Sequence, residues 1–137
     1  MTASARVSAL PGTRILIVDD EPDNRALLEV ILKWEGFATL SADSGEEALL
    51  AAAEHAPDLI LLDLMMPGLD GCEVTARLKA NSATWYIPIV MITAMTDRLT
   101  RERVLRAGAA DFLTKPVDRT ALCQCVRRHL CLTAARD

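Results

Sequence analysis

The stretch from Ile60 to Gly71 constrains the fold of this chain more than any other. An apolar run, ILLDL at residues 60–64, contains a single charge at Asp63 and leads into turn-forming residues. Such a run is typical of a parallel strand that is buried on both faces. Pro67 and Gly68 then turn the chain sharply. We therefore expect Asp63 at the carboxyl end of a central strand, where open α/β sheets bind their ligands.

Four other short apolar runs alternate with segments of helical periodicity. The predicted strands cover residues 14–19, 37–41, 58–63, 87–93 and 110–113. Parallel strands that are separated by helices need right-handed crossovers and have helices on both faces of the sheet. The sequence thus predicts an α/β fold, a (βα)5 doubly wound five-stranded parallel sheet.

Capping residues mark where the helices between these strands begin and end. The first helix is expected from Pro22 to Gly36, with Leu27, Val30, Ile31 and Trp34 along one apolar face. Ser44 with Glu47 forms a capping-box signature, and a helix runs through Val74 and Leu78. Asp97 and Asp118 are predicted to cap the last two helices, with Gly108 ending the first of these two.

Composition excludes several classes of protein. The chain has 137 residues, of which 51% are hydrophobic and 25% charged, which suits one domain with an aliphatic core. We expect a tail at residues 1–12, a domain at 13–131 and a second tail at 132–137. No apolar window is long enough for a membrane span and no secretory signal is visible, so we expect a cytoplasmic protein without membrane insertion.

Charge and cysteine usage indicate no nucleic-acid or zinc site. Residues 97–137 carry 9 basic and 5 acidic side chains, but the basic ones alternate with apolar residues and lack aromatic stacking partners. We expect no direct nucleic-acid contact. The cysteines form no Cys-x-x-Cys pair, and we expect none to stand near a histidine at ligand spacing, so all four are predicted to be reduced and structural. They are Cys72, Cys123, Cys125 and Cys131.

Polar side chains end several of the predicted strands. Because the carboxyl ends of parallel strands share one edge of the sheet, Asp19, Asp20, Asp63, Thr93 and Lys115 should meet in one cleft. Crowded carboxylates need a cation to stay ionised, and oxygen-only ligands select a hard ion such as Mg²⁺. This set suits phosphoryl transfer, with Asp63 as the nucleophile and with Thr93 and Lys115 on the phosphate oxygens.

At this point the sequence resembles the receiver domain of two-component response regulators over about residues 13–131. Four elements in the expected order carry the resemblance, and their combination is highly specific. They are VDDE at 18–21, DLMMPGLDG at 63–71, Thr93-Ala94 and Lys115-Pro116. The resemblance implies the flavodoxin-like strand order 2-1-3-4-5.

The resemblance also implies a role for each matching residue. Asp63 is the expected phosphoacceptor. Asp19, Asp20 and Asp63 are the expected carboxylate ligands of Mg²⁺, with Mn²⁺ as a substitute, and Met65 offers its backbone carbonyl. Pro67 and Gly68 shape the turn behind Asp63.

The remaining matching residues would bind phosphate and respond to it. Thr93 is the switch hydroxyl, with Ala94 beside it, and Lys115 binds phosphate before a cis bond to Pro116. Phe112 occupies the place of the switch aromatic, whose ring would move inward when Thr93 is drawn to the phosphate. A permanently buried core Phe is the alternative.

Two methionines bear on the lifetime of the phosphoryl group. By resemblance, Met65 and Met95 flank the path of the hydrolytic water. Neither side chain can orient a water molecule by a strong hydrogen bond. We therefore expect slow self-dephosphorylation, over minutes or longer.

Several functions are compatible with this reading. The leading one is a switch that accepts phosphate from a histidine kinase or a histidine phosphotransfer protein. It would then bind a downstream protein, or a second copy of itself, through its fourth helix, fifth strand and fifth helix. A shuttle in a phosphorelay, or the receiver part of a longer regulator, is the alternative. A Mg²⁺-dependent phosphohydrolase is disfavoured because such enzymes usually carry a second Asp two residues after the nucleophile, where this chain has Met65.

Few residues follow the apolar positions of the last predicted helix. Only residues 131–137 follow Leu130, too few for an output domain. If the chain is complete, we expect its output to be protein contact, through the arginine-bearing last two helices or through Trp85 and Tyr86.

Overall fold

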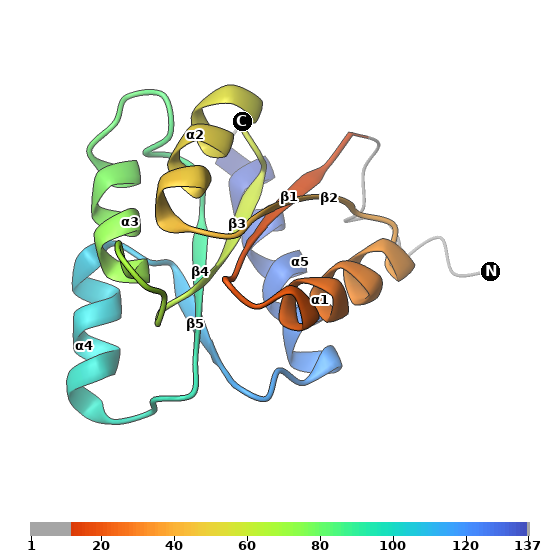
Figure 1. Cartoon of the computed structure of the whole chain (residues 1–137). Helices are drawn as coiled ribbons and strands as arrows, with labels where there is room; N and C mark the ends of the chain where they lie inside the picture. Colours follow the sequence, from red (N-terminus) through yellow and green to blue (C-terminus); the bar gives the residue numbers. More distant parts are fainter. Residues whose placement is uncertain (1–11, 137) are drawn as a thin grey trace.

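The computed structural model describes residues 12–136, so the predicted tail at 1–12 lies almost wholly outside the described residues. Five strands and five helices alternate along the chain (Figure 1). The strands are β1 (Arg14–Val18), β2 (Ala38–Ala42), β3 (Leu59–Asp63), β4 (Ile89–Thr93) and β5 (Asp111–Thr114). The helices are α1 (Pro22–Trp34), α2 (Gly45–His55), α3 (Gly71–Lys79), α4 (Arg98–Ala107) and α5 (Arg119–Arg136).

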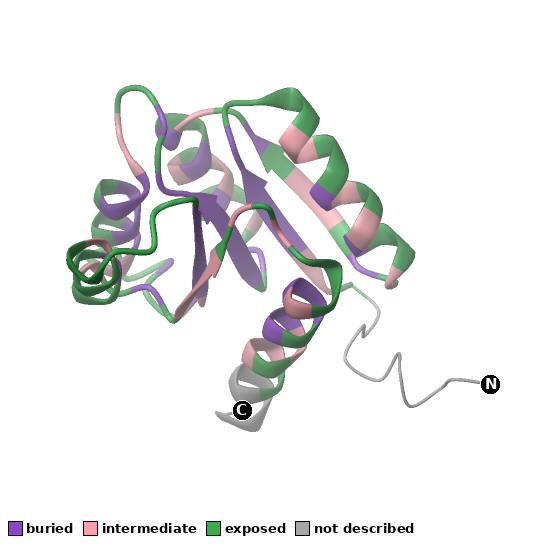
Figure 2. Cartoon of the chain, turned by 90° about the horizontal axis from the view of Figure 1, so that it is seen from below, coloured by how far each residue is buried: buried purple, intermediate pink, exposed green. Residues whose placement is uncertain are grey.

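The strands form one parallel sheet in the order β2-β1-β3-β4-β5, which confirms the predicted fold class and strand order. The central position of β3 explains its composition, because every residue from Leu59 to Asp63 is buried. Figure 2 shows this buried centre between helices that are exposed on their outer sides. Asp63 therefore does end a central buried strand.

Helices cover both faces of the sheet. On one face, α1 and α5 pack against the alternate strand residues that include Ile15, Ile17 and Leu61. On the other face, α2, α3 and α4 pack against the intervening residues, among them Leu16 and Leu62. Fully burying an aliphatic side chain stabilises a fold by about 1.5–3 kcal/mol. These two layers therefore fix the strands, and with them the positions of the residues at the strand ends.

The apolar face predicted for α1 only partly matches the face that packs on the sheet, because Ile31 alone of its four residues packs against this core. Leu28 and Leu32 are buried, whereas Leu27, Val30 and Trp34 are 56%, 66% and 71% exposed. Apolar residues surround much of this helix, so periodicity alone supports two overlapping faces. The packing of α1 over Ile15 and Ile17 selects the one with Leu28 and Leu32.

Most predicted helix ends are confirmed. Asp97 and Asp118 accept hydrogen bonds from the N–H groups of Thr100 and Ala121, and Gly108 ends α4 with φ +111°. Ser44 accepts from the N–H of Glu47, but the Glu47 carboxylate accepts from Asp43 and not from Ser44, so the capping box there is incomplete. The predicted tail at 132–137 is helical up to Arg136, since no proline or glycine interrupts α5.

The prediction that no cysteine stands near a histidine at ligand spacing is wrong. Cys125 and His129 lie one turn apart on α5, and both face Asp111 at the start of β5. The four-residue spacing was present in the sequence, but the third group comes from another element. As predicted, the cysteines are not in disulfides, and Cys72, Cys123 and Cys125 are buried.

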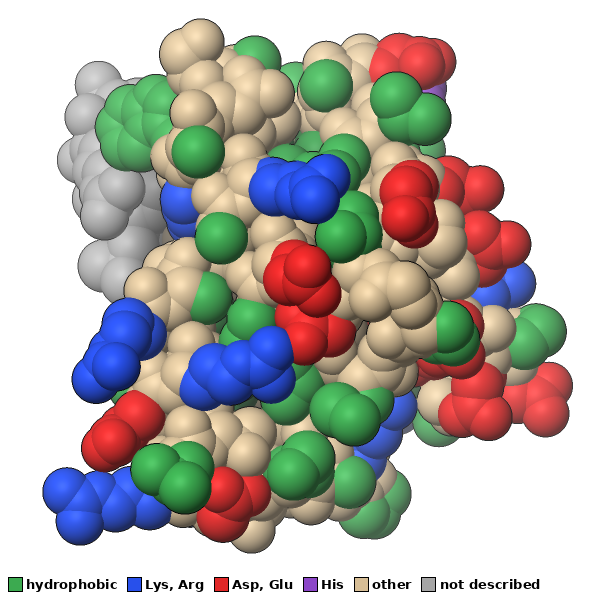
Figure 3. Space-filling view, turned by 60° about the vertical axis from the view of Figure 1, so that its left-hand side comes forward, with side chains coloured by type: hydrophobic (Ala, Val, Ile, Leu, Met, Phe, Trp, Pro, Cys, Tyr) green, Lys and Arg blue, Asp and Glu red, His purple; other side chains and the backbone are tan. Residues whose placement is uncertain are grey.

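Two surface predictions can be compared with the structure. Trp85 and Tyr86 are 55% and 45% exposed and their rings meet edge to face, with centroids 6.2 Å apart. Within residues 12–136, no helix combines the length and the apolar character that a membrane crossing needs. Figure 3 shows basic side chains dispersed among acidic and hydrophobic ones on one face of the molecule.

Candidate functional site

Three carboxylates meet at the carboxyl edge of the sheet. Asp19 and Asp20 follow β1, and Asp63 ends β3, the neighbouring strand. One oxygen of each lies within 4.8 Å of the others. Asp19 and Asp63 are buried, and Asp20 is exposed. The parallel topology thus brings together the acids that the sequence placed at separate strand ends.

Lys115 reaches into this acidic group from the loop after β5. Its Nζ lies 3.1 Å from Asp63 Oδ1 and 3.6 Å from Asp19 Oδ2. Burial by itself would lower the pKa of Lys115, but the hydrogen bond and charge of Asp63, with the charge of Asp19, raise it. The ammonium group is therefore held in its charged form beside the carboxylates.

The surroundings of Asp63 oppose its ionisation. Burial raises its pKa above the usual 3.8, and the charge of Asp19 raises it further. Lys115 and the N–H of Met65 act in the opposite direction without cancelling the effect. A divalent cation beside Asp63 would relieve this cost, because it would favour the ionised form.

Backbone contacts fix the position of Asp19. Its Oδ1 accepts a hydrogen bond from the N–H of Glu21 at 2.9 Å, and its backbone carbonyl accepts one from the Arg25 guanidinium at 2.8 Å. We did not predict this role for Arg25. The only signal in the sequence was a basic side chain in the first turns of the helix that follows the acids.

Thr93 stands at the same edge, at the end of β4 and next to β3. It is buried, and its Oγ1 accepts a hydrogen bond from the N–H of Met95 at 2.9 Å. Ala94 and Met95 are exposed. The Lys115 N–H donates to the Thr93 carbonyl at 2.9 Å, and the Lys115–Pro116 bond is cis, as predicted.

The turn after Asp63 is held close to the sheet. Met65, Pro67 and Gly68 are exposed, and Gly68 has φ +77°, a conformation that favours glycine. A Cβ on Gly71 would lie 2.9 Å from the Asp63 carbonyl and 2.5 Å from Met91 Sδ. Gly71 therefore allows α3 to start directly against the strand that carries Asp63.

A cleft of about 500 Å³ opens beside the acidic group. Asp19, Ala94, Lys115 and Pro116 line it, together with Leu27 and Leu28 of α1. The cleft therefore reaches Asp19 and Lys115 from the side of α1.

Phe112 lies on β5 away from the carboxylates. It is half-buried against the core layer of α2, α3 and α4, and the Arg101 guanidinium of α4 lies 5.4 Å from its ring centroid. Sequence reasoning missed Arg101, because a contact between α4 and β5 depends on how the two elements pack. The predicted switch role of Phe112 stays a prediction.

Comparison with known proteins identifies relatives over most of the chain. The sequence model of the response regulator receiver domain matches residues 15–127. The response regulator PleD of Caulobacter vibrioides is 48% identical over 116 residues, which are 85% of this chain and 26% of PleD. The DNA-binding response regulator MtrA of Mycolicibacterium smegmatis is 44% identical over 117 residues, 85% of this chain and 50% of MtrA. This chain thus spans a quarter to a half of these relatives.

The similar solved structures are also response regulators or receiver domains. A putative response regulator from Chloroflexus aurantiacus is 34% identical with a TM-score of 0.83, and the match covers 87% of this chain and 98% of that one. The receiver domain of a sensor histidine kinase from Pseudomonas aeruginosa is 33% identical with a TM-score of 0.81, and covers the same shares. The latter structure holds a magnesium ion in its active site cleft.

Proposed function

Because this chain belongs to the response regulator receiver domain family, a family of two-component signalling, we propose that Asp63 is the residue at which its switch is phosphorylated. The observation that carries the proposal is the contact of Lys115 Nζ with Asp63 Oδ1 at 3.1 Å, inside a group of three carboxylates. An ammonium group there can neutralise a phosphate oxygen that is attached to Asp63.

The residues of the cleft suit the chemistry of transfer from a phosphohistidine. An oxygen of the Asp63 carboxylate attacks phosphorus, a P–O bond forms, and the P–N bond to the donor histidine breaks as that imidazole takes up a proton. Lys115 and the Thr93 hydroxyl then hold phosphate oxygens. The cleft beside α1, which Asp19 and Lys115 line, is where we expect the donor side chain to approach.

The carboxylate group has the ligands that Mg²⁺ requires. Asp19, Asp20 and Asp63 would hold the ion with the backbone carbonyl of Met65, and Mn²⁺ would serve as a substitute. An ion held there would neutralise charge on the phosphate oxygens. The raised pKa of Asp63 supports this assignment, since the carboxylates are crowded without a cation.

The response to phosphorylation would pass through Thr93 to the face that α4, β5 and α5 form. A shift of Thr93 toward the phosphate leaves space on its side of β5, and the Phe112 ring moves into it. Arg101 then loses its contact with the ring, which changes the surface of α4. This face would bind a downstream protein or a second copy of the chain.

For the donor end we propose a histidine kinase or a histidine phosphotransfer protein as the partner, in the cytoplasm. Its own chemistry would be self-phosphorylation and slow loss of the phosphoryl group, without turnover of a small substrate. A shuttle in a phosphorelay is the second candidate. Back-transfer to a phosphotransfer protein that is faster than hydrolysis would favour the shuttle.

The test is phosphorylation by acetyl phosphate with Mg²⁺, read as mass of the protein and as oligomeric state. We expect one phosphoryl group per chain in the wild type and none in Asp63→Asn. Asp43→Asn is the matched control, because Asp43 also follows a strand, β2, but is exposed and outside the carboxylate group. Labelling of Asp63→Asn at the wild-type rate, or no labelling of the wild type, would overturn the proposal.

A further inference from the structure

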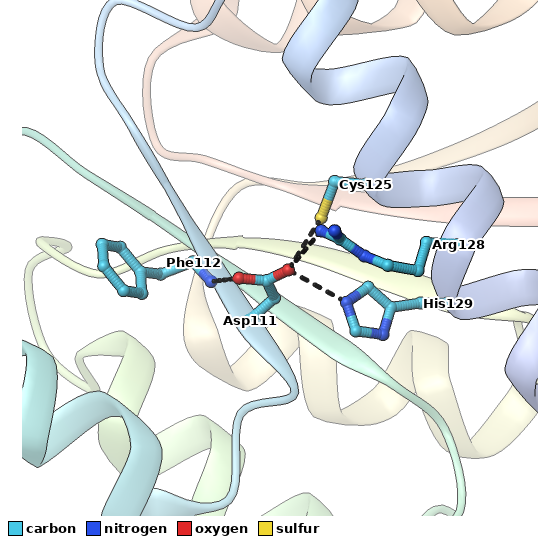
Figure 4. Close-up of polar contacts among 5 residues, drawn as sticks. All are labelled: Asp111, Phe112, Cys125, Arg128 and His129. Carbon is cyan, nitrogen blue, oxygen red and sulfur yellow. Dashed lines mark hydrogen bonds and ion pairs between the residues drawn. The ribbon is translucent and has the colours of Figure 1, made fainter.

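A second group of potential metal ligands lies at the edge of the sheet opposite Asp63. Asp111 is the first residue of β5, whereas Thr114, the last, leads into Lys115 at the phosphorylation edge. Cys125 and His129 stand one turn apart on α5, so both reach the same part of β5. Figure 4 shows all three side chains converging there, while Phe112 points away.

The distances within this group resemble the edges of a tetrahedral metal site. Asp111 Oδ2 lies 3.5 Å from Cys125 Sγ and 3.1 Å from His129 Nε2, and one potential ligand atom of each residue lies within 4.8 Å of the other two. Zinc bonds of about 2.0–2.3 Å at tetrahedral angles would separate neighbouring ligands by roughly 3.3–3.7 Å. Small side-chain adjustments would therefore bring the three atoms onto one ion.

From this arrangement we infer that Asp111, Cys125 and His129 form a binding site for Zn²⁺, separate from the magnesium site. One sulfur, one imidazole nitrogen and one carboxylate oxygen are the ligand types that zinc takes in proteins. Magnesium requires oxygen ligands, so the two ends of the sheet would sort the two ions by donor chemistry.

The group is preformed but retains access to solvent. Cys125 is buried, the His129 side chain is 11% exposed and the Asp111 side chain is 30% exposed. Water can therefore take the fourth position on the ion from the side of Asp111. The site spans β5 and α5, so bound zinc would tie α5 to the edge strand.

In the metal-free protein, hydrogen bonds hold the three side chains together. Burial raises the pKa of Cys125 to about 11, so its thiol is protonated and donates to Asp111. Zinc would displace this proton, because a coordinating thiol binds as the thiolate. Arg128 competes with the ion, since its Nη2 lies 2.8 Å from Asp111 Oδ2, but its side chain is 60% exposed and can swing into solvent.

The experiment uses the full chain without a histidine tag, with a phosphine reductant and saturating Mg²⁺ to occupy the carboxylates around Asp63. Zinc affinity is measured by competition with a chromophoric chelator. Cobalt serves as a spectroscopic substitute, because a thiolate ligand gives it a charge-transfer band. We expect one zinc per chain and this band in the wild type.

The variants separate a metal site from a hydrogen-bonded cluster. Cys125→Ser should lose the cobalt band and bind zinc at least tenfold more weakly than the wild type. His129→Gln should also bind zinc at least tenfold more weakly. Cys123→Ser is the matched control, because Cys123 is a second buried thiol of α5 outside the group, and it should bind like the wild type. Arg128→Gln should bind zinc more tightly, because a competing cation is removed.

The proposal fails if the wild type binds zinc no more tightly than His129→Gln, or if Cys123→Ser loses as much affinity as Cys125→Ser. His129→Gln also decides the matter should Cys125→Ser not fold, since it leaves every buried thiol in place. Asp63→Asn should keep the zinc site, so this result is independent of the proposed phosphorylation.

Discussion

At the scale of single residues, Asp63 combines burial with a neighbouring charge of the same sign. Both features oppose its ionisation, and Lys115 only partly offsets them. The carboxylate is thus destabilised before any cation or phosphoryl group arrives. If Mg²⁺ binds here as proposed, it would favour the ionised form of Asp63, so metal binding would also prepare this carboxylate to react.

The raised pKa of Asp63 predicts how stability depends on pH in EDTA. Its protonated form favours the fold, so its contribution is complete below pH 3.8 and is lost as pH rises through the higher pKa of the folded state. Asp63→Asn cannot ionise. Relative to the wild type, we expect this variant to gain stability as pH rises above 3.8.

Urea denaturation of both proteins across this pH range measures the difference. Addition of Mg²⁺ at pH 7 should reverse it, because the ion stabilises the wild type but has lost one ligand in the variant. Parallel pH curves for the two proteins would show that Asp63 ionises as easily in the fold as in the unfolded chain.

Met65 predicts a second effect at the residue scale, on the lifetime of the phosphoryl group. Its side chain is 60% exposed beside Asp63, and a thioether cannot orient an attacking water molecule. Met65→Asn should shorten the lifetime by roughly tenfold, less than the 10²–10⁴ of a full general base. Met65→Leu is the matched control and should leave the lifetime unchanged. The decay of phosphorylated protein after removal of acetyl phosphate measures both, and equal decay of the two variants would contradict the role.

At the scale of secondary structure, the start of α3 supports the turn that carries Met65. Asp70 Oδ1 accepts from the N–H of Glu73 at 2.9 Å, and the Glu73 carboxylate accepts from the N–H of Asp70 at 3.3 Å. The capping box at Asp70 is therefore complete. The sequence suggested one at Ser44 instead, where the box is incomplete. Asp70 also pairs with Arg103 of α4, so one side chain fixes two helices.

The capping box makes a prediction about α3. Asp70→Ala removes both the cap and the ion pair and should destabilise the fold by about 1–2 kcal/mol. Asp70→Asn keeps a good capping side chain and loses only the charge, so it should cost less than about 1 kcal/mol, the usual value of an exposed ion pair. Urea denaturation at pH 7 measures both. Equal losses would mean that the contact with Arg103, and not the cap, is what stabilises α3.

At the scale of the whole molecule, the sequence could predict the sheet and the site because both follow from topology. Parallel strands share an edge, so residues at strand ends were certain to meet once the alternation of strands and helices was read. The boundaries of β4 were less certain, because the predicted strand included Ile87 and Pro88, whereas β4 begins at Ile89. A proline has no N–H for the ladder and weakens a strand at that position.

Features that depend on packing between elements could not be predicted. The buried face of α1 is chosen by the sheet beneath it, and apolar residues on several sides of the helix hide that choice. Asp111 meets Cys125 and His129 only because α5 packs on β5 with these two residues against the first residue of the strand. The contact of Arg101 with Phe112 likewise depends on the distance between α4 and β5.

That last contact leads to a prediction for the whole molecule, because Arg101 and Phe112 belong to the proposed binding face, which should respond to phosphorylation at Asp63. The chain has two phenylalanines, Phe37 and Phe112. Phe37 is buried against α1, whereas Phe112 is half-buried under Arg101. In protein labelled with fluorophenylalanine, each gives one ¹⁹F resonance, so Phe37 is an internal reference.

We expect phosphorylation with Mg²⁺ to shift the Phe112 resonance and to leave that of Phe37 nearly unchanged. The physical reason is that inward motion removes the ring from the Arg101 charge and from solvent, whereas Phe37 keeps its packing. Arg101→Ala should move the Phe112 resonance of the unphosphorylated protein part of the way toward its position in the phosphorylated protein. Asp63→Asn should show no response to acetyl phosphate. If Phe112 keeps its resonance in fully phosphorylated protein, the ring is a fixed part of the core, and the signal must leave Thr93 by another route.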